Sequence, residues 1–88
     1  MRKYFHLFEV EYMSCEGNYR TANVILESDY DEISTDLAQS EYYANSDYFG
    51  DSPAEMVGGS HITTCNSSDE IAAYCSASGI FAETYQID

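Results

Sequence analysis

The sequence predicts a single small α+β domain: a mainly antiparallel sheet of about four strands with two helices, in the order ββαβαβ. Stretches rich in aromatic and β-branched residues alternate with stretches whose apolar residues recur at helical spacing, which is the main reason for this prediction. The chain has 88 residues, of which 44% are hydrophobic, so it suits one domain with its own core rather than a disordered segment. We expect both helices to lie on one face of the sheet.

A β-hairpin is expected at the start of the chain, with strands over residues 4–13 and 19–27. Between the strands, Gly17 and Asn18 both tolerate the positive φ angles that a tight turn needs. Alternation places Glu9 and Glu11 on one face of the first strand. Five side chains share the opposite face: Tyr4, His6, Phe8, Val10 and Tyr12.

A first helix is expected from Asp29 to about Tyr43, with Asp29 as the N-cap and Glu32 as its capping-box partner. Acidic residues in the first turn suit the helix dipole. A polar connection over residues 45–53 follows the helix. The apolar side of the helix consists of Tyr30, Ile33, Leu37 and Ala38.

The second half of the chain predicts a strand, a short helix and a last strand. The strands are expected over residues 60–65 and 80–85. The helix between them begins with Ser67 as N-cap and Glu70 as capping-box partner, and Gly79 ends it. We expect Cys75 on its buried side, because small thiols are common core residues.

The distribution of charge is the most informative feature of the chain. The formal net charge is −13, from 16 acidic and 3 basic residues. The cations Arg2, Lys3 and Arg20 all lie in the first 20 residues, whereas residues 21–88 carry 13 acidic residues and no Lys or Arg. This long segment must project a negative field that attracts cations or a basic protein surface.

The same composition argues against several classes of protein. Direct binding to nucleic acid is not expected, because phosphate contacts need Lys and Arg. No apolar run approaches the ~18–20 residues that span a bilayer, and Glu9 and Glu11 interrupt the stretch that a signal peptide would need. We expect a cytoplasmic protein with free thiols at Cys15, Cys65 and Cys75, the alternative being one disulfide and one free thiol.

Neither a cofactor nor a bound metal is expected. Asn45, Asp47 and Gly50 match three positions of a calcium-binding EF-hand loop, but Phe49 and Met56 occupy the positions for further ligands. The chain has no nucleophile elbow and no phosphate-binding glycine loop, so we expect no enzymatic activity. Zinc ligands of suitable chemistry are present without the usual paired spacing: His6, Cys15, His61, Cys65 and Cys75.

Acidic residues and aromatic rings interleave between positions 29 and 51. On the expected helix, Asp29, Glu32 and Asp36 would lie about 5–6 Å apart, close to the spacing of phosphates along a nucleic-acid strand. Tyrosines offer large contact areas with few rotatable bonds, and carboxylates pair bidentately with arginine. A solvated acidic face is the plain alternative, although such a face would not need to exclude Lys and Arg. The candidate partner-binding residues are Asp29, Asp31, Glu32, Asp36, Glu41, Tyr42, Tyr43, Asp47, Tyr48 and Asp51.

In size, acidity and α+β pattern, the whole chain resembles the small acidic inhibitors encoded by bacteriophages and mobile elements, namely anti-CRISPR proteins and DNA-mimic antirestriction proteins. This resemblance is one of composition and involves no diagnostic motif. It implies that an acidic surface occupies the basic nucleic-acid channel of a host defence complex, such as a CRISPR-Cas effector or a restriction nuclease. Well-known DNA mimics are often strongly helical and dimeric, whereas this chain shows a mixed pattern.

We therefore expect a non-enzymatic inhibitor whose partner is a basic nucleic-acid-binding protein or ribonucleoprotein complex. One alternative is an acidic adaptor that binds a basic partner without excluding nucleic acid, and a second is a small metal-binding module. An exposed edge of a four-stranded sheet would also permit two copies of the chain to pair.

Overall fold

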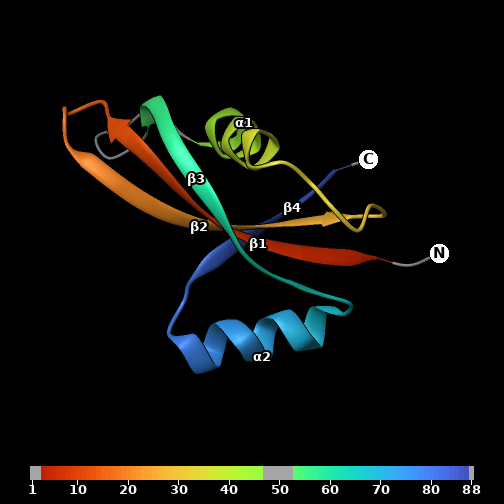
Figure 1. The fold of residues 1–88 in the computed structure, drawn as a ribbon. Helices are drawn as coiled ribbons and strands as arrows, with labels where there is room; N and C mark the ends of the chain where they lie inside the picture. The colour runs from red at the N-terminus through yellow and green to blue at the C-terminus, as the bar shows by residue number, and fades with distance from the viewer. Residues whose placement is uncertain (1–2, 47–52, 88) are drawn as a thin grey trace.

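A computed structural model of the chain describes residues 3–46 and 53–87 and shows a four-stranded mixed sheet with two helices (Figure 1). The predicted α+β class and the order ββαβαβ are confirmed. In chain order the elements are β1 (Tyr4–Ser14), β2 (Tyr19–Ser28), α1 (Thr35–Asn45), β3 (Pro53–Cys65), α2 (Ser68–Ser78) and β4 (Ala82–Gln86).

The two long strands of the hairpin form the centre of the sheet, whose strand order is β3-β1-β2-β4. β1 pairs antiparallel with both β2 and β3, whereas β4 runs parallel to β2. The hairpin forms as predicted, with Tyr4 opposite Ser28 and with Gly17 at a positive φ of 85° in the turn. The sheet is therefore mainly antiparallel, with one parallel pair at the edge.

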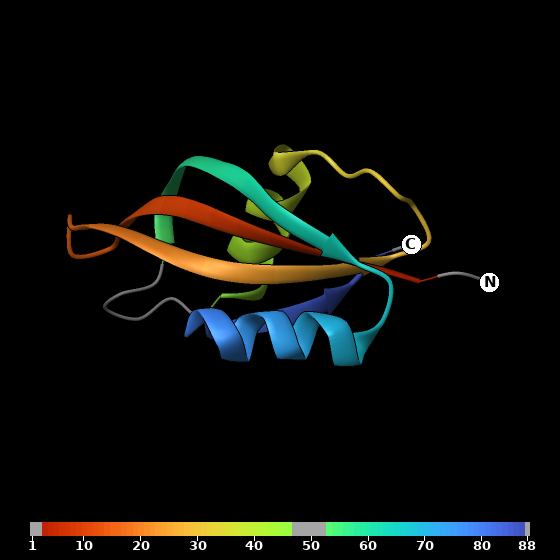
Figure 2. The same ribbon diagram turned by 60° about the horizontal axis from the view of Figure 1, so that its bottom comes forward.

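The two helices cover opposite faces of the sheet, so the expectation that they share one face is wrong (Figures 1 and 2). The physical reason lies in β1, which is apolar on both faces. Phe5 and Leu7 pack in a cluster with α2, whereas Phe8 and Val10 pack in a second cluster with α1. A strand that buries both faces needs a cover on each side.

The first helix begins later than predicted, at Thr35, and its N-cap is Ser34 rather than Asp29. The Ser34 hydroxyl accepts a hydrogen bond from the backbone N–H of Leu37 at 3.3 Å. Residues 29–34 instead form a connection from β2 to α1. Its backbone is held against β1, because the Tyr30 carbonyl oxygen bonds to the imidazole of His6. This bond joins the backbone at Tyr30 to β1 ahead of the first turn of α1.

The second helix matches its prediction closely. The Ser67 hydroxyl accepts from the backbone N–H of Glu70 at 3.1 Å, and Gly79 ends the helix in the left-handed conformation with φ 68°. Ile71 and Cys75 are its buried residues, which confirms the expected place of Cys75. The strand before α2 is longer than expected, since it begins at Pro53 instead of residue 60, and β4 lies two residues later than predicted at its start.

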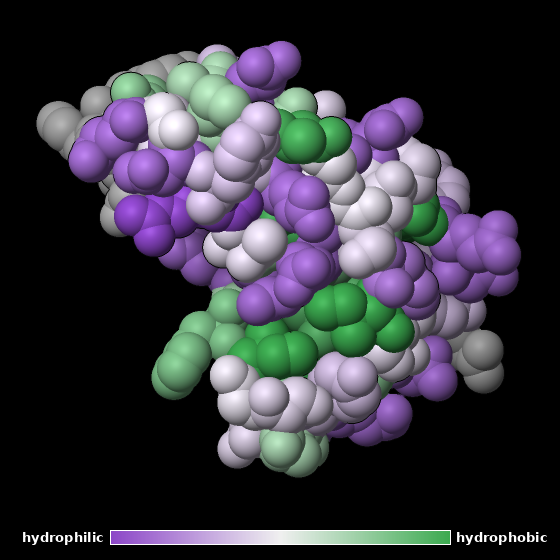
Figure 3. Space-filling model, turned by 60° about the vertical axis from the view of Figure 1, so that its left-hand side comes forward, coloured by the Kyte–Doolittle hydropathy of each residue, from purple (hydrophilic) through white to green (hydrophobic). Residues whose placement is uncertain are grey.

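On the α2 side of the sheet, four apolar residues that pack against the core are only partly buried: Ile62, Cys65, Ile80 and Ala82. The space-filling view shows polar side chains over most of one face of the molecule and an exposed apolar groove between them (Figure 3).

On α1, Ala38 is buried, but Leu37 is 36% exposed and does not take the core position expected of it. Within the described residues, neither helix is long and apolar enough to cross a membrane.

Candidate functional site

The acidic residues 29–36 lie along the connection between β2 and α1 and on the first turn of α1. Ser28, which is fully buried, accepts a hydrogen bond from the backbone N–H of Tyr30 at 2.8 Å and so fixes the start of this connection. The side chains of Asp29, Asp31, Glu32 and Asp36 are all exposed. The helix-face spacing expected for them is wrong, because the first three precede the helix.

One of these carboxylates has a cation beside it. Lys3 Nζ lies 3.3 Å from Asp29 Oδ1, and each side chain is 45% exposed. An ion pair this open to water contributes little to stability, about 0–1 kcal/mol. Asp29 is thus partly neutralised, whereas Asp31 and Glu32 receive no hydrogen bond or ion pair from any described residue.

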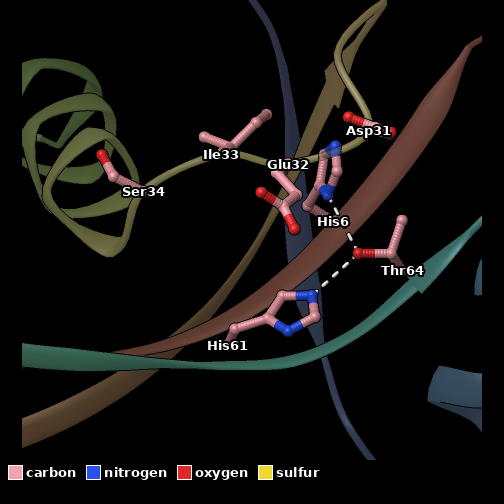
Figure 4. A pocket seen from close by; sticks show the side chains of 7 residues that line it. All are labelled: His6, Asp31, Glu32, Ile33, Ser34, His61 and Thr64. Carbon is pink, nitrogen blue, oxygen red and sulfur yellow. Dashed lines mark hydrogen bonds between the residues drawn. The ribbon is translucent and has the colours of Figure 1, made fainter.

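A cavity of about 570 Å³ lies beside this connection (Figure 4). Three separate parts of the chain form it: β1, the connection, and the end of β3. Its position between them explains why no local sequence motif marks it. The lining residues are His6, Asp31, Glu32, Ile33, Ser34, His61 and Thr64.

A chain of hydrogen bonds runs along one wall of the cavity (Figure 4). The hydroxyl of Thr64 lies between two imidazoles, 2.9 Å from His6 Nδ1 and 2.8 Å from His61 Nε2. The other ring nitrogen of His6, Nε2, lies 2.8 Å from the carbonyl oxygen of Tyr30. We call these four groups the His–Thr–His relay.

The direction of each hydrogen bond in the relay follows from the chemistry of its members. The Tyr30 carbonyl only accepts, so His6 Nε2 carries a hydrogen and donates it. Burial lowers the pKa of His6 below its ordinary value of 6.5, so its ring is neutral at pH 7 and Nδ1 accepts from Thr64. Thr64 has then used its only hydrogen, so His61 Nε2 donates to the Thr64 oxygen.

The relay explains how a histidine can occupy a core position. His6 is 1% exposed and lies on the same strand face as Phe8, so both of its nitrogens need partners. The sequence placed His6 on this face and identified it only as one of several residues with zinc-ligand chemistry. The available signal was the polar ring itself, since a buried imidazole requires a donor and an acceptor from elsewhere in the chain.

The electrostatics of the cavity oppose nucleophilic catalysis. A hydroxyl beside a neutral imidazole that a third group orients has the composition of an activated nucleophile. Attack on a carbonyl would, however, develop negative charge in a cavity that Asp31 and Glu32 line, whereas such chemistry needs donors at that point. The arrangement therefore favours a positively charged ligand.

The remaining predicted residues lie in different environments. Tyr42 is half-buried and packs against Tyr12 with 5.4 Å between ring centroids; burial raises the pKa of its hydroxyl. Glu41 accepts a hydrogen bond from the side chain of Asn45 at 3.3 Å. Tyr43 is 36% exposed and lines a second cavity of about 430 Å³ together with Asp36. Three further candidates lie outside the described residues: Asp47, Tyr48 and Asp51.

The structure brings no metal-binding set together in the part of the chain that it describes, where no three His, Cys, Asp or Glu residues group as ligands. Cys15 is exposed in the hairpin turn, and Cys75 is a buried residue of α2. Of the three residues that match a calcium loop, Asp47 and Gly50 lie outside the described residues.

Comparison of the chain with protein-family models, with curated proteins and with solved structures finds no match.

Proposed function

We propose that this chain is a non-enzymatic inhibitor that binds a basic, nucleic-acid-handling complex through the acidic surface formed by residues 29–36. The partner would be a defence complex such as a CRISPR-Cas effector or a restriction nuclease, and the protein would act in the cytoplasm of the host cell. The inhibitor would compete with nucleic acid for a basic channel, as the resemblance to small phage inhibitors implies.

The observation that carries this proposal is the exposure of the negative charge. None of the acidic side chains in the described residues is buried, and the 3 cations of the chain cannot neutralise its 16 acids. An exposed field of one sign accelerates encounter with an oppositely charged surface and selects against acidic partners.

The structure changes which residues are the best candidates for contact. Asp31, Glu32 and Asp36 remain, because they are exposed and adjacent to the two cavities. Among the tyrosines, Tyr30 is 61% exposed within the acidic connection and is a better anchor than Tyr42, which is half-buried against Tyr12. Tyrosine and arginine contacts of this kind dominate many interfaces.

A pulldown with matched variants tests the proposal. The variant D31N/E32Q/D36N removes three exposed charges from the candidate surface, and E16Q/D69N/E70Q removes three exposed charges elsewhere. From nuclease-treated bacterial lysate, the wild type and the second variant should capture the same nucleic-acid-binding complex, and the first should not. Equal capture by the two variants would contradict the proposed surface: at the wild-type level it would show that these charges are not needed, and at an equally reduced level it would show that only the net charge matters.

The adaptor alternative differs in one measurable respect. An adaptor and nucleic acid would occupy the captured complex together, whereas an inhibitor of the proposed kind would be displaced by added DNA or guide RNA.

A further inference from the structure

We propose that the cavity between β1, β3 and the 29–34 connection is a receptor for one arginine side chain of the partner protein. This inference rests on the proposed function, since it names the group that the acidic surface would bind. The hydrogen-bonding capacity, the charge and the lining of the cavity each favour such a ligand.

The hydrogen-bonding groups of the cavity leave acceptors available and few donors. The relay uses the hydrogens of His6 Nε2, Thr64 and His61 Nε2 internally. The carboxylates of Asp31 and Glu32 can only accept. A ligand that satisfies these groups must therefore bring several N–H donors.

The charge of the cavity selects a cation. Two carboxylates line it, no described Lys or Arg does, and the buried His6 is neutral at pH 7. Asp29 already has Lys3 beside it, but Asp31 and Glu32 lack a described cationic partner. An incoming positive group would complete this part of the surface without displacing a described internal ion pair.

The shape of the cavity favours a guanidinium over an ammonium. A guanidinium is planar and presents five N–H donors, so it can form two parallel hydrogen bonds to a carboxylate and stack on a ring. His61 supplies such a ring at the wall, and its bond to Thr64 fixes the ring orientation. Ile33 supplies an apolar wall for the methylene groups, and about 570 Å³ is ample room for one side chain.

The test uses small probes and needs no partner protein. Nα-acetyl-arginine amide, the lysine equivalent and the neutral, nearly isosteric citrulline equivalent are titrated into the full chain, and binding is followed by amide chemical shifts. The arginine probe should give saturable shifts centred on residues 31–34, 61 and 64. The lysine probe should bind more weakly, and the citrulline probe should not produce these shifts.

A matched pair of variants assigns the site. The sequence Asp-Glu occurs at 31–32 and again at 69–70 on α2, and all four side chains are exposed. D31N/E32Q should weaken arginine binding about tenfold, a change of about 1.4 kcal/mol, whereas D69N/E70Q should leave it close to wild type. Equal losses in both variants, or equal binding of arginine and citrulline probes, would overturn the receptor.

The outcome separates this inference from the proposed function. If the arginine probe fails to bind while D31N/E32Q/D36N still loses its captured partner, the receptor is wrong and the inhibitory surface stands. If the probe binds as described while that variant captures the partner normally, the cavity binds guanidinium but the proposed surface is wrong.

Discussion

At the scale of single residues, one buried imidazole joins three parts of the chain through hydrogen bonds. His6 lies at a core position of the central strand and is satisfied only because Thr64 and the Tyr30 carbonyl reach it from two distant parts of the chain. The same bonds position His61 and the acidic connection around the cavity. Folding and the candidate site therefore depend on the same few contacts.

Removal of the Thr64 hydroxyl should destabilise the fold. Thr64→Val leaves Nδ1 of His6 buried without a donor, so we expect the free energy of unfolding to fall by about 1–3 kcal/mol. Thr64→Ser keeps the hydroxyl and should lose less. Urea unfolding of both variants measures the difference. A smaller loss for Thr64→Val than for Thr64→Ser would mean that the methyl group, and not the hydrogen bond, matters most at this position.

The lowered pKa of His6 predicts how stability depends on pH. Because the folded state resists protonation, His6 contributes fully to stability above its unfolded value of 6.5, and this contribution declines as the pH falls below 6.5 towards the folded pKa. Histidine ¹⁵N shifts should show His6 titrating below 6.5 with its hydrogen on Nε2. A titration at or above 6.5 would contradict the relay.

At the scale of elements, local capping signals predicted α2 well and α1 poorly. Ser67 and Gly79 bound α2 through contacts within a few residues, which sequence patterns contain. The connection before α1 instead contacts β1 through a bond between Tyr30 and His6, 24 residues apart in sequence. An acidic run resembled a helix start at Asp29, but this tertiary contact holds the segment as a connection.

The two candidate N-caps of α1 can be compared directly. Ser34→Ala removes the hydroxyl that accepts from Leu37 N–H, and it should lower the free energy of unfolding by about 1 kcal/mol. Asp29→Ala should cost less, since it removes only an open ion pair with Lys3. Chemical denaturation measures both. A larger loss for the Asp29 variant would restore the earlier helix start.

The arrangement of elements was predictable in part. Local patterns predict the hairpin, the order of the elements and the presence of both helices and strands. They do not predict that the helices lie on opposite faces of the sheet. That placement depends on the two-sided burial of β1, where Leu7 and Phe8 are adjacent and both fully buried. The cavity could not be predicted either, because its walls come from three distant segments.

At the scale of the whole molecule, a net charge of −13 on 88 residues affects both the stability of the folded state and association with a charged partner. Self-repulsion opposes the compact state, and salt screens it within a Debye length of about 10 Å at 0.1 M. The thermal midpoint should therefore rise as NaCl increases from about 0.01 to 0.2 M. The slope should be smaller for D31N/E32Q/D36N. A midpoint independent of salt would show that the repulsion is unimportant for folding.

The most direct test of the central claim is competition between this protein and nucleic acid for the captured complex. Labelled DNA or guide RNA is bound to the purified complex, and its displacement by the wild-type chain is followed by fluorescence anisotropy at increasing salt. We expect displacement by the wild type and by E16Q/D69N/E70Q, strongest at low salt, and little displacement by D31N/E32Q/D36N. Stable binding of the protein and the nucleic acid to the complex at the same time would contradict the account.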